Sequence, residues 1–285
     1  MIMKHFKNSN DAIVGVVVAI LLVGLCVTVI SIIQVVYVPE WMYSKEAEHM
    51  DEVADQFANL KYALDIQSAI EQDIPVSTPI TLGSKELPVF SSVRAFGFLR
   101  ILSNECSITV ANDTDSLSYA IGVIKYSSAN VYFIDQSYIF EAGAVILNQS
   151  REPQGDVMCA NPLFSVNNSG DVNISFTMIN ISSFGGKTSI SGYRTYQIQT
   201  SFLSSSNGAV YDAQNINITT NYPDSWKTFF NNTLVDSGLT YGTDNDFWIN
   251  DTASGMKVVF SESITVNLSL QLIEIQAQIG SGWIQ

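Results

Sequence analysis

The chain has 285 residues, of which 47% are hydrophobic and only 14% are charged, and its formal net charge is -14 at pH 7. Intrinsic disorder requires low hydrophobicity with high charge, and a nucleic-acid partner requires a basic surface, so this composition excludes the first and predicts no nucleic-acid binding. The charges are uneven, because residues 12–39 carry none whereas residues 40–73 carry nine acids and two lysines. We therefore expect several distinct physical environments along the chain.

An uncharged apolar run extends from Ala12 to Val38, and Gln34 is its one strongly polar side chain. Its 27 residues exceed the ~20 that a helix needs to cross the hydrocarbon core of a bilayer. A secretory signal has a shorter apolar region that ends at a small-residue cleavage site, and no such site follows Val38. We therefore expect a transmembrane helix over residues 12–38, with the buried helix of a soluble protein as the alternative.

The residues that flank this run predict its orientation. Lys4 and Lys7 precede it and acids dominate after it, so the positive-inside rule places residues 1–11 in the cytoplasm as a short leader. The same rule places the rest of the chain outside the cell, with Tyr37 and Trp41 at the outer interface, where aromatic side chains are enriched. The expected location is a single-pass cell-membrane protein with an extracellular C-terminal domain.

Residues 39–73 have the pattern of an acidic amphipathic stalk helix outside the membrane. Apolar residues recur at spacings of three and four, which indicates one apolar helix face. These residues are Met50, Val53, Phe57, Leu60 and Leu64. The stripe either packs on a partner helix in an assembly or packs on the downstream domain of the same chain. Pro39 predicts a kink or brief break at the start of this helix, which we expect to end near Asp73.

Residues 74–285 have the pattern of a mainly antiparallel β domain of the sandwich type. After a connecting segment rich in Pro and Gly, short runs of alternating polar and apolar residues dominate, and many are bounded by Gly, Ser, Asn or Asp. The expected strands are 93–102, 106–111, 118–126, 130–134, 137–141, 143–148, 172–178, 193–202, 214–220, 256–261 and 263–272. One short helix is expected over residues 225–234, capped by Asp224 or Ser225. The expected fold class is therefore α+β.

The β domain contains nine Asn-x-Ser/Thr sequons, which is more than the chance expectation of about four. They are Asn112, Asn148, Asn167, Asn173, Asn180, Asn217, Asn231, Asn250 and Asn267. This excess predicts a glycosylated extracellular surface. In the alternative interpretation, Asn, Ser and Thr simply occupy the solvent face of the strands.

The expected chemistry of the β domain is limited. Cys106 and Cys159 could form one disulfide outside the cell, or could remain two separate thiols. The chain has two histidines, and neither lies beyond residue 73, so a Ser-His-Asp or Cys-His arrangement and a histidine metal site are absent from the domain. We expect no cofactor, no metal site and no enzymatic activity.

The order of segments resembles that of archaeal type IV pilin-like and flagellin-like surface proteins. A short basic leader precedes Asn10-Asp11-Ala12-Ile13-Val14-Gly15, a long apolar helix, an acidic continuation and a β domain. The stretches Gly83-Ser84-Lys85-Glu86-Leu87-Pro88 and Tyr138-Ile139-Phe140-Glu141-Ala142-Gly143 are similar to those of an uncharacterised archaeal group with this layout.

This resemblance implies that a membrane prepilin peptidase removes the leader between Asp11 and Ala12. It also implies that the apolar helices then leave the lipid and bundle into a filament core. The implied partners are membrane lipid, other copies of the chain or other pilin-like subunits, and an assembly machinery. The chain lacks the Lys/Arg-Gly pair that often precedes the cut and the Glu that often follows it, since Val16 and Val17 stand there.

The leading hypothesis is therefore a non-enzymatic, pilin-like structural subunit of the cell surface that polymerises through its N-terminal helix. A permanently anchored adhesin or binding module that forms no filament is the main alternative, since it requires neither of the missing processing residues. An anchored extracellular hydrolase is a third hypothesis, which the absence of histidine from the β domain disfavours.

Overall fold

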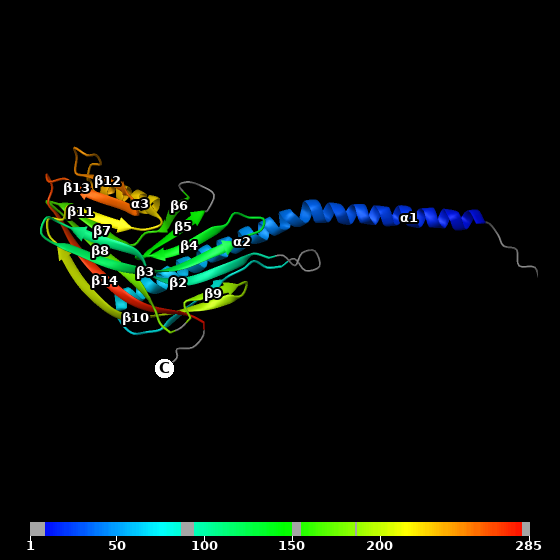
Figure 1. The fold of residues 1–285 in the computed structure, drawn as a ribbon, viewed down its shortest axis with the longest axis horizontal. Coiled ribbons are helices and arrows are strands. Elements are labelled where there is room, and N and C mark those ends of the chain that lie inside the picture. The colour runs from blue at the N-terminus through cyan, green and yellow to red at the C-terminus, as the bar shows by residue number, and fades with distance from the viewer. Residues whose placement is uncertain (1–8, 87–93, 150–154, 186, 281–285) are drawn as a thin grey trace, which may run out of the picture.

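The computed structural model describes residues 9–86, 94–149, 155–185 and 187–280, and it places a long helical rod at one end of a β-rich body (Figure 1). Residues 1–8 of the predicted leader lie outside the described residues. The rod consists of α1 (Ser9–Ile32), the π-helical segment η1 (Ile33–Tyr37) and α2 (Val38–Ile70) in unbroken succession. The expected α+β class is confirmed, with an apolar N-terminal helix followed by a mostly antiparallel β domain.

The helix continues through Pro39, so a break there is excluded, and the rod changes direction between α1 and α2 (Figure 1). Proline has no N–H to donate, and an α-helix would lose one hydrogen bond there. The chain instead adopts π-helical geometry just before the proline, where the N–H of Val38 donates to the carbonyl of Ile33 five residues back. This wider turn carries the backbone past Pro39 without ending the helix. The helix ends at Ile70, where Glu71 adopts a left-handed conformation with φ of 52°, slightly before the expected end.

The strands form two sheets. The first has the order β1-β10-β14-β8-β7, and the second has the order β12-β13-β11-β2-β3-β4-β5-β6, with β9 also paired to β2. Neighbouring strands are antiparallel except β14 and β8, which are parallel. Their bounds are β1 Val76–Thr81, β2 Phe96–Ala111, β3 Ser116–Ala129, β4 Gln136–Glu141, β5 Ala144–Gln149, β6 Asp156–Ala160, β7 Leu163–Ser169, β8 Asp171–Ser183, β9 Ser189–Gly192, β10 Thr195–Val210, β11 Asn215–Thr219, β12 Phe247–Thr252, β13 Gly255–Phe260 and β14 Val266–Ile279.

Several strand predictions need correction. Residues 93–102 and 106–111 were expected as two strands, but β2 is one long strand with a shift of register between Leu102 and Cys106, which is a bulge opposite β3. Residues 130–134 were expected as a strand and instead form a loop. The strands β1, β6, β7, β9 and β12 were not expected; most of them are short and lie at or near sheet edges, where alternation is weak.

The helix α3 (Pro223–Asp236) confirms the one helix expected in the β domain, but its capping differs from the expectation. Tyr222 is the N-cap residue and provides no side-chain cap. The N–H of Ser225 instead donates to Asp156 Oδ2 of β6 at 2.8 Å. A side chain from another element thus satisfies one of the free N–H groups of the first helical turn. A local cap such as Asp224 is not needed here.

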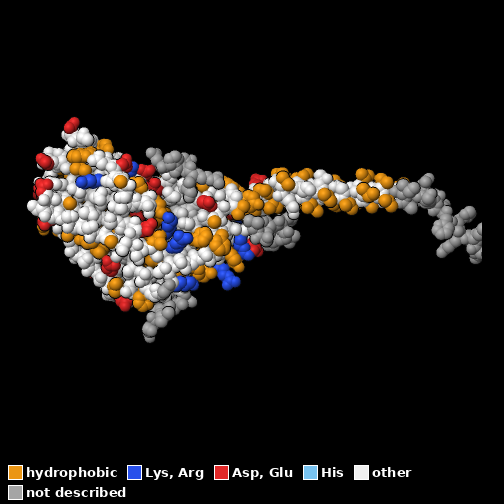
Figure 2. Space-filling model, viewed as in Figure 1, with side chains coloured by type: hydrophobic (Ala, Val, Ile, Leu, Met, Phe, Trp, Pro, Cys, Tyr) orange, Lys and Arg blue, Asp and Glu red, His pale blue; other side chains and the backbone are white. Residues whose placement is uncertain are grey.

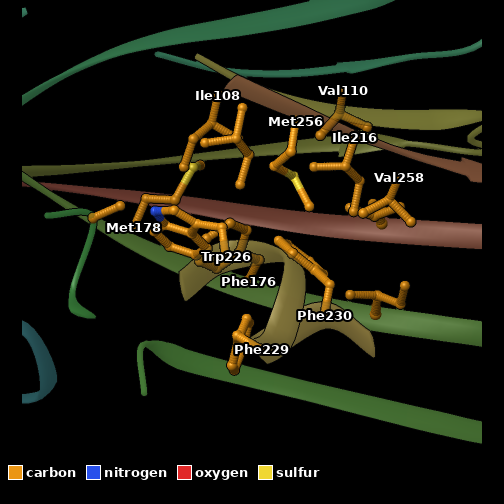
Figure 3. Packing of buried hydrophobic residues seen from close by; sticks show 14 of the residues in the cluster. Ile108, Val110, Phe176, Met178, Ile216, Trp226, Phe229, Phe230, Met256 and Val258 are labelled. Atoms are coloured by element: carbon orange, nitrogen blue, oxygen red, sulfur yellow. The ribbon is translucent and has the colours of Figure 1, made fainter. Parts of the chain in front are cut away.

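The two sheets enclose two adjoining hydrophobic clusters. The cluster at the end far from the rod is built around α3, with Trp226, Phe229 and Phe230 packed on Phe176 and Met178 of β8 (Figure 3). The cluster near the rod contains apolar residues of both sheets and the buried face of α2. Between the sheets, Gly122 of β3 lies so close to the carbonyl of Ile181 that a Cβ would be 2.1 Å from it. A side chain there would push the sheets apart.

The α2 helix is therefore part of the core of the body. Met50, Val53, Phe57, Leu60 and Leu64 are all fully buried among residues of both sheets. Of the two roles considered for this stripe, the structure shows packing on the protein's own domain. The predicted stalk at 39–73 and the predicted domain from residue 74 onward therefore share one hydrophobic cluster near the rod.

Replacing Phe57 by Ala should destabilise the whole body, because the ring is fully buried and packs 5.7 Å from the ring of Tyr138. We expect a loss of about 3 to 5 kcal/mol in the free energy of unfolding, the usual cost of removing a buried phenyl ring. Urea unfolding of the full chain in detergent measures it. Asn59→Ala, an exposed change on the same helix, should leave the midpoint unchanged, and equal effects of the two variants would contradict this packing.

Candidate functional site: the apolar rod and its junction with the body

The part of the rod outside the body is apolar on every side. The side chains described from Val14 to Ile32 are exposed, and no residue of the most apolar window is buried inside the structure. Among the described residues, this is the one helix long and apolar enough to cross a membrane. The 24 residues of α1 extend about 36 Å at the helical rise, against ~30 Å for the hydrocarbon core of a bilayer. Lipid or other protein must cover this surface.

Two hydroxyl groups of the rod form hydrogen bonds within it. The hydroxyl of Thr28 donates to the carbonyl of Gly24 at 2.8 Å, and the hydroxyl of Ser31 donates to the carbonyl of Val27 at 2.7 Å. A hydroxyl without a partner would be costly in an apolar environment. These bonds make the rod compatible with either lipid or a tightly packed helix bundle.

Glu46 joins the rod to the body and was not identified from the sequence. Its carboxylate is fully buried and accepts hydrogen bonds from the backbone N–H groups of Val131, Tyr132 and Phe133 at 3.0, 2.7 and 2.7 Å. This is why residues 130–134 are a loop rather than a strand, since three successive N–H groups must turn toward one carboxylate. A signal did exist, because Glu46 precedes Met50 by four residues and so lies on the apolar helix face.

His49 lies one turn further along the same face of α2. Its ring is 3% exposed, and its Nε2 lies 3.0 Å from the carbonyl oxygen of Thr81. Burial lowers the pKa of the imidazole, which the Thr81 carbonyl and nearby carboxylates only partly offset. Its other ring nitrogen, Nδ1, has no hydrogen-bond partner among the described residues.

Glu141 is a second fully buried carboxyl group, beside α3 in the far cluster. Its Oε1 accepts hydrogen bonds from Thr220 Oγ1 at 2.7 Å and Trp226 Nε1 at 2.8 Å, while Oε2 has no partner among the described residues. Burial raises the pKa of this carboxyl to about 7, although the hydrogen bonds from Thr220 and Trp226 oppose the rise. The Glu141 carboxyl is enclosed within the fold, so its protonation affects the stability of the protein.

The structure keeps the predicted cysteines apart. Cys106 is buried in the far cluster, Cys159 is exposed on β6, and both are free thiols, as is Cys26 on the rod. Burial and the neighbouring Glu141 raise the pKa of the Cys106 thiol well above its usual value, so it is an unreactive core residue. Of the two alternatives considered, the structure shows separate thiols.

None of the nine sequon asparagines is fully buried. Asn167, Asn173 and Asn250 are exposed, while Asn112, Asn148, Asn180, Asn217, Asn231 and Asn267 are partly covered.

Three of these asparagines are constrained. The Nδ2 of Asn180 donates to both carboxylate oxygens of Glu274 at 3.0 and 2.8 Å, and its Oδ1 accepts from the N–H of Gly122 at 2.6 Å, so the amide that would carry a glycan is engaged. Asn173 and Asn267 lie directly opposite each other on the paired strands β8 and β14. Two glycans on such neighbours would compete for the same space.

Asp11 and Ala12, the predicted processing site, belong to the first turn of α1. The structure describes their backbone but not their side chains.

No protein-family model, curated protein or solved structure matches this chain. The functional argument therefore rests on the geometry of the rod and of its junction with the body.

Replacing Glu46 by Ala should leave the N–H groups of Val131, Tyr132 and Phe133 without their acceptor. We expect the free energy of unfolding to fall by about 3 kcal/mol or more, since hydrogen bonds to a charged group contribute about 1.5 to 3 kcal/mol. Thermal unfolding of the full chain in detergent measures it. Glu48→Ala, which removes an exposed carboxylate two residues away, is the matched control and should have little effect; equal effects would show that the loop does not depend on Glu46.

The Glu141 carboxyl should make stability depend on pH. Its pKa is higher in the folded chain than the usual value of 4.5, so the folded state holds an extra proton between pH 4.5 and about 7. The free energy of unfolding should therefore be greatest at the acid end of this range and fall by about 3 kcal/mol toward pH 7. Glu141→Gln, which keeps an acceptor for Trp226, should abolish this fall, whereas Glu262→Gln at an exposed position should retain it. Urea unfolding across this range tests both, and an unchanged slope in Glu141→Gln would contradict the assignment.

Proposed function

We propose that the protein is a non-enzymatic structural subunit of the cell surface, inserted in the membrane through α1 and able to polymerise through its N-terminal helix. The observation that carries this proposal is the single unbroken helix from Ser9 to Ile70, apolar and uncovered in its first half and fixed in the body in its second. A helix of this kind can exchange lipid contacts for contacts with identical helices, because both bury the same apolar surface. This is also the layout that the resemblance to type IV pilin-like proteins implies.

The outer face of α2 supports self-association rather than lipid contact alone. Tyr62, Ile66 and Ile70 are 68%, 37% and 48% exposed and follow one another at four-residue spacing on the side opposite the core. At the helical rise, Ile66 lies about 38 Å beyond Trp41, the residue expected at the membrane interface. Lipid does not reach that height, so a protein surface is the natural cover for this stripe. A neighbouring copy, with its own exposed helix, provides one.

A permanently anchored surface binding protein remains the second candidate. The outer face of β8 and β14 favours it, because Ser175, Ser269 and Gln271 line a shallow groove with Asn207 and Gly208 of β10. Such a groove of hydroxyl and amide groups could bind a polar ligand without any filament. In that case the leader would remain attached to the anchor.

The test replaces an exposed tyrosine on the outer face of α2. Tyr62→Glu should abolish or strongly reduce filaments seen by electron microscopy of the source cells, because a charge would be buried between subunits. Tyr211→Glu is the matched control, since Tyr211 is 73% exposed on the body, and it should leave filaments unchanged.

Mass spectrometry of the native protein completes the test. A mature chain that begins at Ala12 is expected for the polymerising subunit. An intact leader together with no filaments from the wild-type chain would overturn the proposal in favour of the permanent anchor.

A further inference from the structure

A cavity of about 460 Å³ lies where α2 enters the body. It is lined by residues 45–52 of α2, by residues 81–86 with Arg94, and by residues 193–195 at the start of β10. On the visible face of the molecule, several Lys and Arg side chains lie in the middle of the body and toward the rod, and acidic side chains are spread over the whole body (Figure 2). The cavity itself has four basic and three acidic side chains in its lining.

Four of the chain's 13 lysines and arginines line this cavity, namely Lys45, Lys85, Arg94 and Arg194. Lys45 and Arg94 each form an ion pair, and the Arg94 guanidinium also lies 3.8 Å from the centre of the Tyr193 ring, which fixes its orientation. Lys85 and Arg194 form no ion pair with any described residue. These two cations are therefore free to bind an anion.

The carboxylates of the cavity already have partners. Glu48 and Glu86 are the acids that pair with Lys45 and Arg94. Glu52 accepts hydrogen bonds from two neutral groups, the amide of Gln56 and the hydroxyl of Thr81. The cavity thus has four basic side chains against three carboxyl groups, and the basic side chains outside ion pairs with described residues are Lys85 and Arg194.

His49 adds a buried acceptor to the cavity wall. A carbonyl oxygen can only accept, so Nε2 carries the proton that is shared with Thr81, and in the neutral ring Nδ1 holds a lone pair. This Nδ1 has no donor among the described residues although the ring is 97% buried, because its exposure is only 3%. This nitrogen has almost no accessible surface, so it belongs to the packed wall and takes no part in binding. The cavity therefore offers cations for an anion.

The height of the cavity matches that of lipid headgroups. With Trp41 at the membrane interface, the helical rise places Lys45 about 6 Å and His49 about 12 Å beyond it. The polar headgroup layer of one leaflet is about 5 to 8 Å thick. A headgroup at the outer surface would therefore reach the lower part of the cavity without leaving its leaflet.

We propose that this cavity binds the headgroup of an anionic phospholipid, for which phosphatidylglycerol is the probe. Lys85 and Arg194 bind the phosphate. The proposal rests on the membrane insertion of the proposed function but not on polymerisation. A bound lipid would hold the body at a fixed height above the membrane.

The test uses the full chain in detergent and native mass spectrometry, in which each bound molecule is identified by its mass. Phosphatidylglycerol, phosphatidylcholine and inorganic phosphate are titrated separately. We expect phosphatidylglycerol to bind most tightly and inorganic phosphate to bind weakly, because phosphate lacks the lipid tails. The double variant Lys85→Gln, Arg194→Gln should weaken phosphatidylglycerol binding about tenfold or more.

Lys257→Gln is the matched control, since it removes the same charge from β13 at the far end of the body, and it should bind phosphatidylglycerol as the wild type does (Figure 1).

Two results would overturn the lipid site. Equal binding of phosphatidylglycerol and phosphatidylcholine, unchanged in the double variant, would show that only the tails bind. Equal binding of phosphatidylglycerol and inorganic phosphate would identify a site for a free anion. The experiment uses the dispersed chain, so lipid binding without filaments would overturn polymerisation alone, and filaments without lipid binding would overturn this inference alone.

Discussion

The burial of one face of α2 between the two sheets is the interaction on which the rest of this structure depends. Met50, Phe57 and Leu64 fill the space near the rod that the strands alone leave open. Buried apolar area is the main source of stability in a domain of this size, and here a large part of it belongs to the helix. If the strands folded without the helix, this apolar surface would be exposed to water, which is unfavourable.

This arrangement makes the exposed apolar part of the rod and the folded body mechanically continuous. A force or rotation applied to α1 is transmitted through a helix that lies within the core, rather than through a flexible linker. Glu46 strengthens the junction, because it fastens the loop at 130–134 to the helix just where the rod leaves the body. A surface subunit that must hold its outer domain in a fixed orientation requires a junction of this kind.

Two buried carboxyl groups illustrate different solutions to the same physical problem. Glu46 is satisfied by three backbone N–H groups, which can stabilise a negative charge without any cation. Glu141 receives fewer donors and keeps one oxygen without a partner, so burial favours its protonated form. The two acids therefore have different consequences. Glu46 holds a loop against the helix, whereas Glu141 makes the free energy of unfolding depend on pH.

The sequence predicted the features that depend on long-range composition. The uncharged run, the apolar face at Met50–Leu64 and the alternating strands all follow from the pattern of apolar residues, and so does the α+β class. The hydrogen bonds between Glu46 and the loop at 130–134 could not be predicted in full, because the partners lie more than eighty residues away from Glu46. The geometry at Pro39 and the parallel pairing of β8 with β14 depend on hydrogen-bond registers that residue types do not specify. The cavity at the junction was not predicted either, since it draws on three distant stretches of chain.

The π-helical turn at Ile33–Tyr37 sets the angular relationship between the two halves of the rod. A π turn accommodates one residue more than an α turn, and each residue of an α-helix advances the side-chain direction by about 100°. The turn therefore determines which side of the apolar segment lies above the outward face at Tyr62 and Ile66. Any change of chain length between Val27 and Val38 would rotate one half against the other and leave each half intact. The handedness and packing angle of any helix bundle formed by this protein would consequently depend on these five residues, none of which is buried.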